Sequence, residues 1–384
     1  FALETPGNGK VELFGVVSKT TAGRNFDGSV TSSASDFREM LKAATGKTLD
    51  NINSKKLRKF DIAANVNARL EEVVSLSLSE LKLQVDDMNV NGALSVKTTK
   101  PTAISFRGNI DSVDVDGYAV NPPVQDDGTS GGLKGNKKLD FGWLRELPVA
   151  AALNMAIGSL STGGKTYKSI KIVGTAKPGS VNLKQAEGTV GTISVGAVAD
   201  LNVVGDRPKF NLNANIGTIK LGELTKTEKQ KETAPAEGGR WSQKVFNFSP
   251  MDQLDGNITA RINSVEGDKI SFSNVSMNGR LAGGKAIIDN LTGGVFGGIV
   301  NMKGELAIQA VPAMSVSFSA DNIDIASAVN GLVTSWPISG RTSVNGNFTS
   351  AGVHQKAMVE NLNGSYKRSD LIELCKTAKN DNIR

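Results

Sequence analysis

Apolar and polar residues alternate over much of this chain, which is the pattern of a β-strand with one buried face. The clearest run is Phe60–Leu70, where every second side chain is apolar and most of the others are polar. The alternation continues over Val74–Leu78 and resumes one residue out of phase at Leu81–Val85. Because a slip of one residue turns all following side chains to the other face, we predict a β-bulge at Ser79 and Glu80.

A longer pattern recurs along the chain at spacings of roughly 80 to 110 residues, which indicates diverged repeats of one unit. Each copy has an alternating strand with a Phe, then a phase shift and a second apolar pair, with a Pro upstream. The apolar positions of the copies are Ile104, Phe106, Ile110, Val113 and Val115, then Phe210, Leu212, Ile216, Ile219 and Leu221, then Val316, Phe318, Ile323 and Ile325. A weaker fourth copy starts near Phe26. We interpret each copy as a set of hairpins followed by a crossover, in a stack where every unit contacts its neighbours.

Helices are expected to be few and short. One is predicted at Asp36–Ala44 with Ser35 or Asp36 as its N-cap, and another at Phe141–Leu147. The Asp-, Gly- and Lys-rich stretch Pro122–Lys138 is predicted to be a loop, and the charged stretch Thr225–Gly239 a flexible linker.

Beyond the linker the strand pattern is expected to restart, at Trp241, Val245, Phe246 and Phe248. The domain prediction is a set of N-terminal repeats, a middle repeat, the linker, a C-terminal β region and an atypical tail. Their respective limits are 1–130, 131–224, 225–240, 241–364 and 365–384.

Composition supports a thin β-structure. Aromatic residues make up 5% and charged residues 21% of the chain, and its 42 glycines suit many strands joined by tight turns. The net charge of +6 is spread along the sequence, without the basic stripe and interleaved aromatics of a nucleic-acid-binding protein. No run of about 18 apolar residues is present, and the sequence begins at Phe1, so we expect any membrane anchor to lie outside it.

Catalytic chemistry is not predicted. His354 is the sole histidine and Cys375 the sole cysteine, which leaves no Ser-His-Asp set, no Cys-His pair and no zinc site. His354 is expected to be a solvated loop residue. Asp116-Gly117 and Gly163-Gly164 resemble calcium and phosphate loops but lack the required spacing, so both are predicted to be turns. We therefore expect a protein that is not an enzyme and has no cofactor and no metal.

The segment Trp241–Gly364 resembles the C-terminal region of the AsmA family of bacterial envelope proteins. The residues that carry the resemblance are Trp241-Ser-Gln, Phe248-Ser-Pro-Met-Asp-Gln-Leu-Asp-Gly, Asn290-Leu-Thr-Gly-Gly-Val-Phe-Gly-Gly, Gly304-Glu-Leu, Ile323-Asp-Ile-Ala, Gly340-Arg and Asn361-Leu-Asn-Gly. Ile104–Tyr118 is similar to the upstream repeats of the family. The resemblance implies an inner-membrane protein that faces the periplasm, related to bridge-like lipid transfer proteins.

From pattern and resemblance together we predict a mostly β fold, an elongated, repeat-built and folded-over antiparallel sheet that forms an apolar groove. The groove is expected to bind or conduct phospholipid between the membranes, or to support outer-membrane assembly, with outer-membrane proteins as possible partners. The residues predicted to line the groove are Phe106, Ile110, Phe210, Leu212, Ile216, Val316 and Phe318. Alternation alone is equally compatible with a closed, dry sandwich, and the alternative function is a structural scaffold for protein contacts without lipid.

Overall fold

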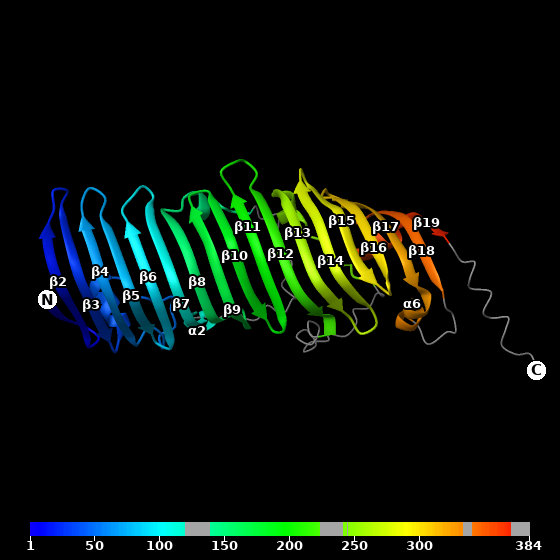
Figure 1. Cartoon of the computed structure of the whole chain (residues 1–384). Coiled ribbons are helices and arrows are strands. Elements are labelled where there is room, and N and C mark those ends of the chain that lie inside the picture. Colours follow the sequence, from blue (N-terminus) through cyan, green and yellow to red (C-terminus); the bar gives the residue numbers. More distant parts are fainter. Residues whose placement is uncertain (120–138, 223–240, 244, 333–339, 370–384) are drawn as a thin grey trace, which may run out of the picture. The chain divides into compact units, whose positions relative to one another are not determined.

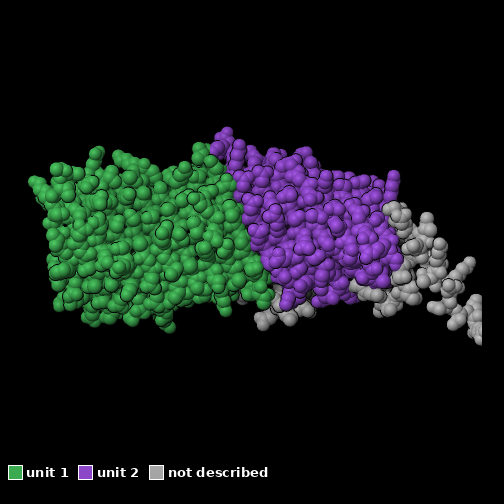
Figure 2. Space-filling view, in the orientation of Figure 1, with its two compact units in different colours: residues 1–132, 140–204 green, residues 133–139, 205–384 purple. Residues whose placement is uncertain are grey.

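The computed structural model describes residues 1–119, 139–222, 241–243, 245–332 and 340–369. The chain divides into two compact units (Figure 2), the first formed by residues 1–132 and 140–204 and the second by residues 133–139 and 205–384. The predicted loop Pro122–Lys138 and the predicted linker Thr225–Gly239 lie outside the described residues.

Unit 1 is built on a sheet whose strands follow one another in sequence order (Figure 1). These strands are β1 (Ala2–Thr5), β2 (Gly9–Lys19), β3 (Arg24–Ala34), β4 (Phe60–Leu70), β5 (Ser75–Val85), β6 (Met88–Lys97), β7 (Thr102–Asp114), β8 (Val149–Thr162), β9 (Lys165–Lys177), β10 (Ser180–Val190) and β11 (Ile193–Asn202). Its helices are α1 (Phe37–Thr45), α2 (Val115–Tyr118) and α3 (Gly142–Arg145).

Unit 2 repeats this design. Its strands are β12 (Lys209–Lys220), β13 (Asp255–Glu266), β14 (Ser271–Ala282), β15 (Lys285–Val295), β16 (Gly298–Ala307), β17 (Ala313–Asp324), β18 (Arg341–Ala351) and β19 (Asn363–Ser369). Its helices are α5 (Ser249–Asp252), α6 (Ile325–Leu332) and α7 (Gln355–Glu360). The expected mostly β fold with a few short helices is confirmed.

Most neighbouring strands are antiparallel, but each unit contains one parallel pair, which the prediction of an antiparallel sheet did not include. These pairs are β7 with β8 and β12 with β13. A parallel pair requires the chain to return to the opposite edge of the sheet before the next strand begins. Strands β7 and β12 carry two of the repeated sequence patterns, and both precede a crossover. The third copy, on β17, is followed by the antiparallel strand β18, so the predicted crossover is wrong for that copy.

Local sequence signals account for several details. The register of β5 against β6 shifts between Leu78 and Leu81, and Glu80 has φ of +50°, so the predicted bulge is confirmed. Helix α1 begins after Asp36, whose carboxylate accepts a hydrogen bond from the backbone N–H of Glu39, so the helix predicted there is confirmed as well. The Gly163-Gly164 turn joins β8 to β9, with φ of +59° and +69° at the two glycines.

Other expectations were wrong. Trp241–Phe248 is not a strand: β13 begins at Asp255, and residue Val245 forms just one isolated bridge, to His354. Asp116-Gly117 is part of the helical turn α2, capped by Asp114, and is not a β-turn. At Gly117 a local hydrogen bond to the Asp114 carboxylate determines the backbone, and at Phe246 a hydrogen bond to the distant Val353 does so. Alternation reports neither contribution.

The two ends of the strands in unit 1 differ. We call the border of the sheet that is formed by the strand ends next to α1, the Asp86-Asp87 turn and α2 the α1 edge. The border at the opposite strand ends, with the Thr20–Gly23 turn and α3, is the α3 edge. At the α3 edge Leu144 and Val203 are fully buried, because α3 packs on the β9–β10 turn: Gly179 donates its N–H to the Leu144 carbonyl at 2.8 Å.

Candidate functional site

The strand register of unit 1 gathers apolar side chains into continuous rows on one face of the sheet. Directly paired residues share a face, so a row can be followed from strand to strand. One row runs through Val66, Leu78, Leu94, Phe106, Leu153, Gly174, Leu183 and Ala199, and the next through Phe26, Ala68, Leu76, Val96, Ile104, Ala151, Ala176, Val181 and Leu201. We call this surface the apolar face of unit 1.

Unit 2 has an apolar face of the same kind. One row contains Leu212, Ile258, Gly279, Ile288, Gly304, Val316 and Phe348, and the next contains Ala214, Ala260, Met277, Leu291, Met302, Phe318, Gly346 and Tyr366. The opposite sides of the same strands carry mostly Asn, Ser, Thr and charged residues, with Ile287 and Ile299 as apolar exceptions. In unit 1 the exposed Phe14 and Val16 are the corresponding exceptions on β2. Each unit therefore has one mainly apolar and one mainly polar face.

The residues predicted to line a groove all lie on these faces. The structure places Phe106 and Ile110 on the apolar face of unit 1. The other predicted residues lie on the apolar face of unit 2: Phe210, Leu212, Ile216, Val316 and Phe318. All are half-buried, whereas their strand neighbours on the polar face, such as Arg107, Asn211 and Ser317, are exposed.

Phenylalanine rings in unit 2 lie over glycines of adjacent strands. A Cβ added to Gly256 would lie 2.5 Å from the ring of Phe210 and 2.2 Å from its carbonyl oxygen. Phe318 occupies the corresponding space over Gly346, and the Phe318 and Phe348 rings stack with centroids 5.6 Å apart. The glycines let the rings lie against the sheet, which gives a shallow apolar surface instead of interlocking knobs.

Other parts of the protein cover the apolar face of unit 1 to different extents at its two ends. At the α1 edge Phe37 of α1 stacks on Phe60 with centroids 4.1 Å apart, and Val85 and Val90 are each 7% exposed. Toward the α3 edge the exposed fraction rises to 53% at Leu70 and 67% at Val17. Over β2 to β4 the apolar face is therefore covered by the protein at the α1 edge and exposed at the α3 edge, whereas α3 covers the α3 edge near the β9–β10 turn.

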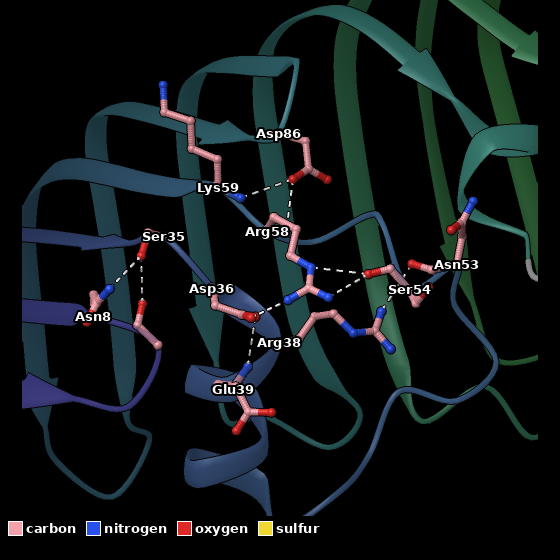
Figure 3. Close-up of polar contacts among 11 residues, drawn as sticks. Asn8, Ser35, Asp36, Arg38, Glu39, Asn53, Ser54, Arg58, Lys59 and Asp86 are labelled. Atoms are coloured by element: carbon pink, nitrogen blue, oxygen red, sulfur yellow. Dashed lines mark hydrogen bonds and ion pairs between the residues drawn. The ribbon is translucent and has the colours of Figure 1, made fainter.

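Hydrogen bonds hold the connection between α1 and β4 along the α1 edge (Figure 3). Asp36 caps α1 and also forms an ion pair with Arg58. The guanidinium of Arg38 donates to the backbone carbonyls of Leu49, at 2.6 Å, and of Ile52 and Asn53. These contacts fix α1 over the apolar face.

Asp86 joins this connection to the rest of the α1 edge. Its carboxylate accepts hydrogen bonds from the backbone N–H groups of Arg58 and Lys59 at 2.7 and 3.1 Å (Figure 3). It also accepts hydrogen bonds from the backbone N–H of Leu57 at 2.7 Å and from the hydroxyl of Tyr118 at 3.1 Å. Burial by itself would raise the pKa of Asp86, but these hydrogen bonds outweigh it and leave the pKa below its ordinary value. Burial and the charge of Asp86 raise the pKa of Tyr118 to about 12.

The groups considered for chemistry have structural partners. The Nδ1 of His354 accepts a hydrogen bond from the backbone N–H of Ala357 at 3.0 Å and caps α7, so the expectation of a solvated loop histidine was wrong. The carboxylate of Asp116 accepts hydrogen bonds from both Gly163 and Gly164, at 2.8 and 2.9 Å. Within the described part of the chain, no group of His, Cys, Asp and Glu side chains could hold a metal ion.

In unit 2 the segment Trp241–Leu254 follows the sheet edge where β18 ends and β13 begins. Phe246 donates its N–H to the Val353 carbonyl at 2.8 Å, and α5 then contacts β14 and β15. The rings of Phe246 and Phe248 lie 5.4 Å apart. Of the motifs that carry the family resemblance, Trp241-Ser-Gln and most of the motif that starts at Phe248 lie in this segment, and the others lie elsewhere in unit 2.

Comparison with known proteins gives one match. Residues 220–368 match the family model described as AsmA family, whereas no curated protein and no solved structure matches the chain. The described residues include no helix with the length and apolar character needed to span a membrane. AsmA proteins are a family of bacterial envelope proteins. The match covers residues 220–368, which include β13 to β18 of unit 2 but not the body of β12, and this similarity to the AsmA family supports an envelope-associated role.

Proposed function

We propose that this protein binds phospholipid in the bacterial envelope, with the acyl chains lying on the apolar faces of the two units. The observation that supports the proposal most strongly is the continuity of the apolar rows combined with their incomplete cover. Side chains such as Phe106, Leu212 and Phe318 are half-buried, which leaves part of their apolar surface for a ligand.

The energetics favour an acyl chain as that ligand. Each methylene group transferred from water to an apolar surface contributes about 0.8 kcal/mol when fully buried. A surface of Phe, Leu, Ile and Val offers no directional contacts, so a chain can occupy successive rows with similar free energy. This property suits movement of lipid along the sheet, and we propose such movement between the inner and outer membranes, on the periplasmic side.

The proposal also assigns no catalytic step to the chain. The polar groups best placed to do chemistry, Asp86, Tyr118, Asp116 and His354, are each engaged in caps and turns. A scaffold that contacts proteins without lipid remains the alternative, and it predicts that the apolar face can be made polar without loss of binding.

Substitutions on opposite faces of β12 and of β17 test the proposal. Leu212→Lys and Phe318→Lys place a charge on the apolar face of unit 2, and Asn213→Lys and Ser317→Lys place the same charge on the polar face. Phospholipid that co-purifies with each protein is measured by mass spectrometry. We expect the first pair to lose most of the bound lipid and the control pair to retain it. Lipid-free wild-type protein, or equal lipid in all variants, would contradict the proposal.

A further inference from the structure

The open end of the unit 1 apolar face carries a pair of cations. Between β2 and β6 the register places charge on this face at Lys19 and Arg24, which are directly paired across the Thr20–Gly23 turn. They occupy the row next to Val17 and Phe26, and Leu70 lies beside Arg24 on β4. Residues two positions apart on a strand are separated by about 7 Å, so the charged row lies directly beside the apolar row that contains Val17 and Phe26.

The cation pair has no anionic partner within the described chain. Both side chains are exposed, and neither forms an ion pair or hydrogen bond with any residue that the structure describes. Glu71 and Glu72, in the turn after Leu70, do not pair with them. Like charges directly opposite each other on neighbouring strands are unfavourable, and an anion between them would relieve the repulsion. Arginine and lysine together provide bidentate and point-charge contacts for a phosphate.

We propose that Lys19 and Arg24 bind the phosphate of a phospholipid headgroup whose acyl chains extend onto the row that contains Val17 and Phe26 and onto the apolar rows beyond it. The inference rests on the proposed function, because it takes the apolar face to be the acyl-chain site. It adds an orientation: the headgroup lies at the α3 edge, and the acyl chains point toward the covered α1 edge. A free phosphate ion has the same anionic chemistry, so the experiment must separate the two sources.

The control lies on the polar face of the same edge. Arg69 and Lys97 occupy positions near the α3 edge, but the register turns them to the opposite side, where they pair with Asn25 and Ser75. Lys19→Gln/Arg24→Gln and Arg69→Gln/Lys97→Gln therefore remove the same charge from opposite faces. Binding of phosphatidylglycerol with a fluorescent acyl chain is compared with binding of diacylglycerol that carries the same chain and lacks phosphate.

We expect Lys19→Gln/Arg24→Gln to bind phosphatidylglycerol about tenfold more weakly than wild type and diacylglycerol equally well, with the control unchanged. Equal phosphatidylglycerol binding by wild type and this variant, or equal weakening in the control, would overturn the inference while leaving acyl-chain binding intact. The cation pair could instead bind inorganic phosphate, with binding that Lys19→Gln/Arg24→Gln weakens, while wild type shows no preference for phosphatidylglycerol over diacylglycerol. That result would refute the inference that the bound phosphate belongs to a lipid. Failure of wild type to bind either lipid would contradict the proposed function itself.

Discussion

Replacing Asp86 by Asn tests whether the α1 edge is held by one carboxylate. Asp86 has φ of +51° in the two-residue turn between β5 and β6, and Asn tolerates that left-handed conformation, so the backbone need not change. The substitution removes the charge and replaces one acceptor oxygen by a donor group. This donor then faces backbone N–H groups of the residues Leu57, Arg58 and Lys59, which are themselves donors.

The expected loss follows from the number of hydrogen bonds affected. A hydrogen bond to a charged group contributes roughly 1.5–3 kcal/mol, and the remaining carbonyl oxygen of Asn preserves part of the set. We expect Asp86→Asn to lower the free energy of unfolding of unit 1 by about 2 kcal/mol. For a unit of this size the midpoint temperature should fall by roughly 4–8 °C.

Urea and thermal unfolding followed by circular dichroism measure the effect, with Asp87→Asn as the matched control. Asp87 is the exposed neighbour in the same turn, so its substitution should change stability little. The carboxyl pKa of Asp86 is depressed in the folded state, and its stabilisation is present above the unfolded value of about 3.9. It is lost as the pH falls through the folded pKa, so wild type and Asp86→Asn should converge in acid. Equal stability of the two proteins at pH 7 would refute the reasoning.

Further predictions concern the aromatic residues. Gly256→Ala should destabilise unit 2 by about 2 kcal/mol or more, since the added methyl group meets the backbone of Phe210, and chemical denaturation measures this loss. Of the 3 tyrosines, one should ionise near pH 12 in an ultraviolet titration, and Tyr118→Phe should remove that step. The stabilisation that accompanies the raised pKa of Tyr118 is complete below its unfolded pKa of about 10 and is lost as the pH rises through 12. A Tyr118→Phe variant whose ultraviolet titration between pH 11 and 13 is the same as that of wild type would contradict this prediction.

Alternation of apolar residues predicted the strands and the faces to which their side chains belong. It succeeded because one face of each strand is in contact with apolar neighbours, so the period of two is under direct physical constraint. The same reasoning located Phe106, Leu212 and Phe318 on the apolar face. The bulge near Glu80 could also be predicted from the phase shift in the sequence, because a bulge is the local change that keeps the apolar side chains on the same face.

Contacts between connections could not be predicted in this way. Alternation gave no position for Asp86, which forms the β5–β6 turn with Asp87 and whose hydrogen-bond partners come from connections far away in sequence. A two-residue Asp-Asp step between two alternating runs is itself a turn signal that would have indicated this. Trp241–Phe248 was misassigned because an apolar edge segment and a strand have the same composition.

The most direct test of acyl-chain binding is site-specific photocrosslinking in cells. A photoreactive phenylalanine analogue is placed at Phe106, Leu212 or Phe318 on the apolar faces, and at Arg107, Asn213 or Ser317 on the polar faces. Crosslinked lipid is then identified by mass spectrometry of the purified protein. The account predicts phospholipid adducts at the apolar-face positions and none at the polar-face positions. Adducts at neither set, or at both sets equally, would contradict it.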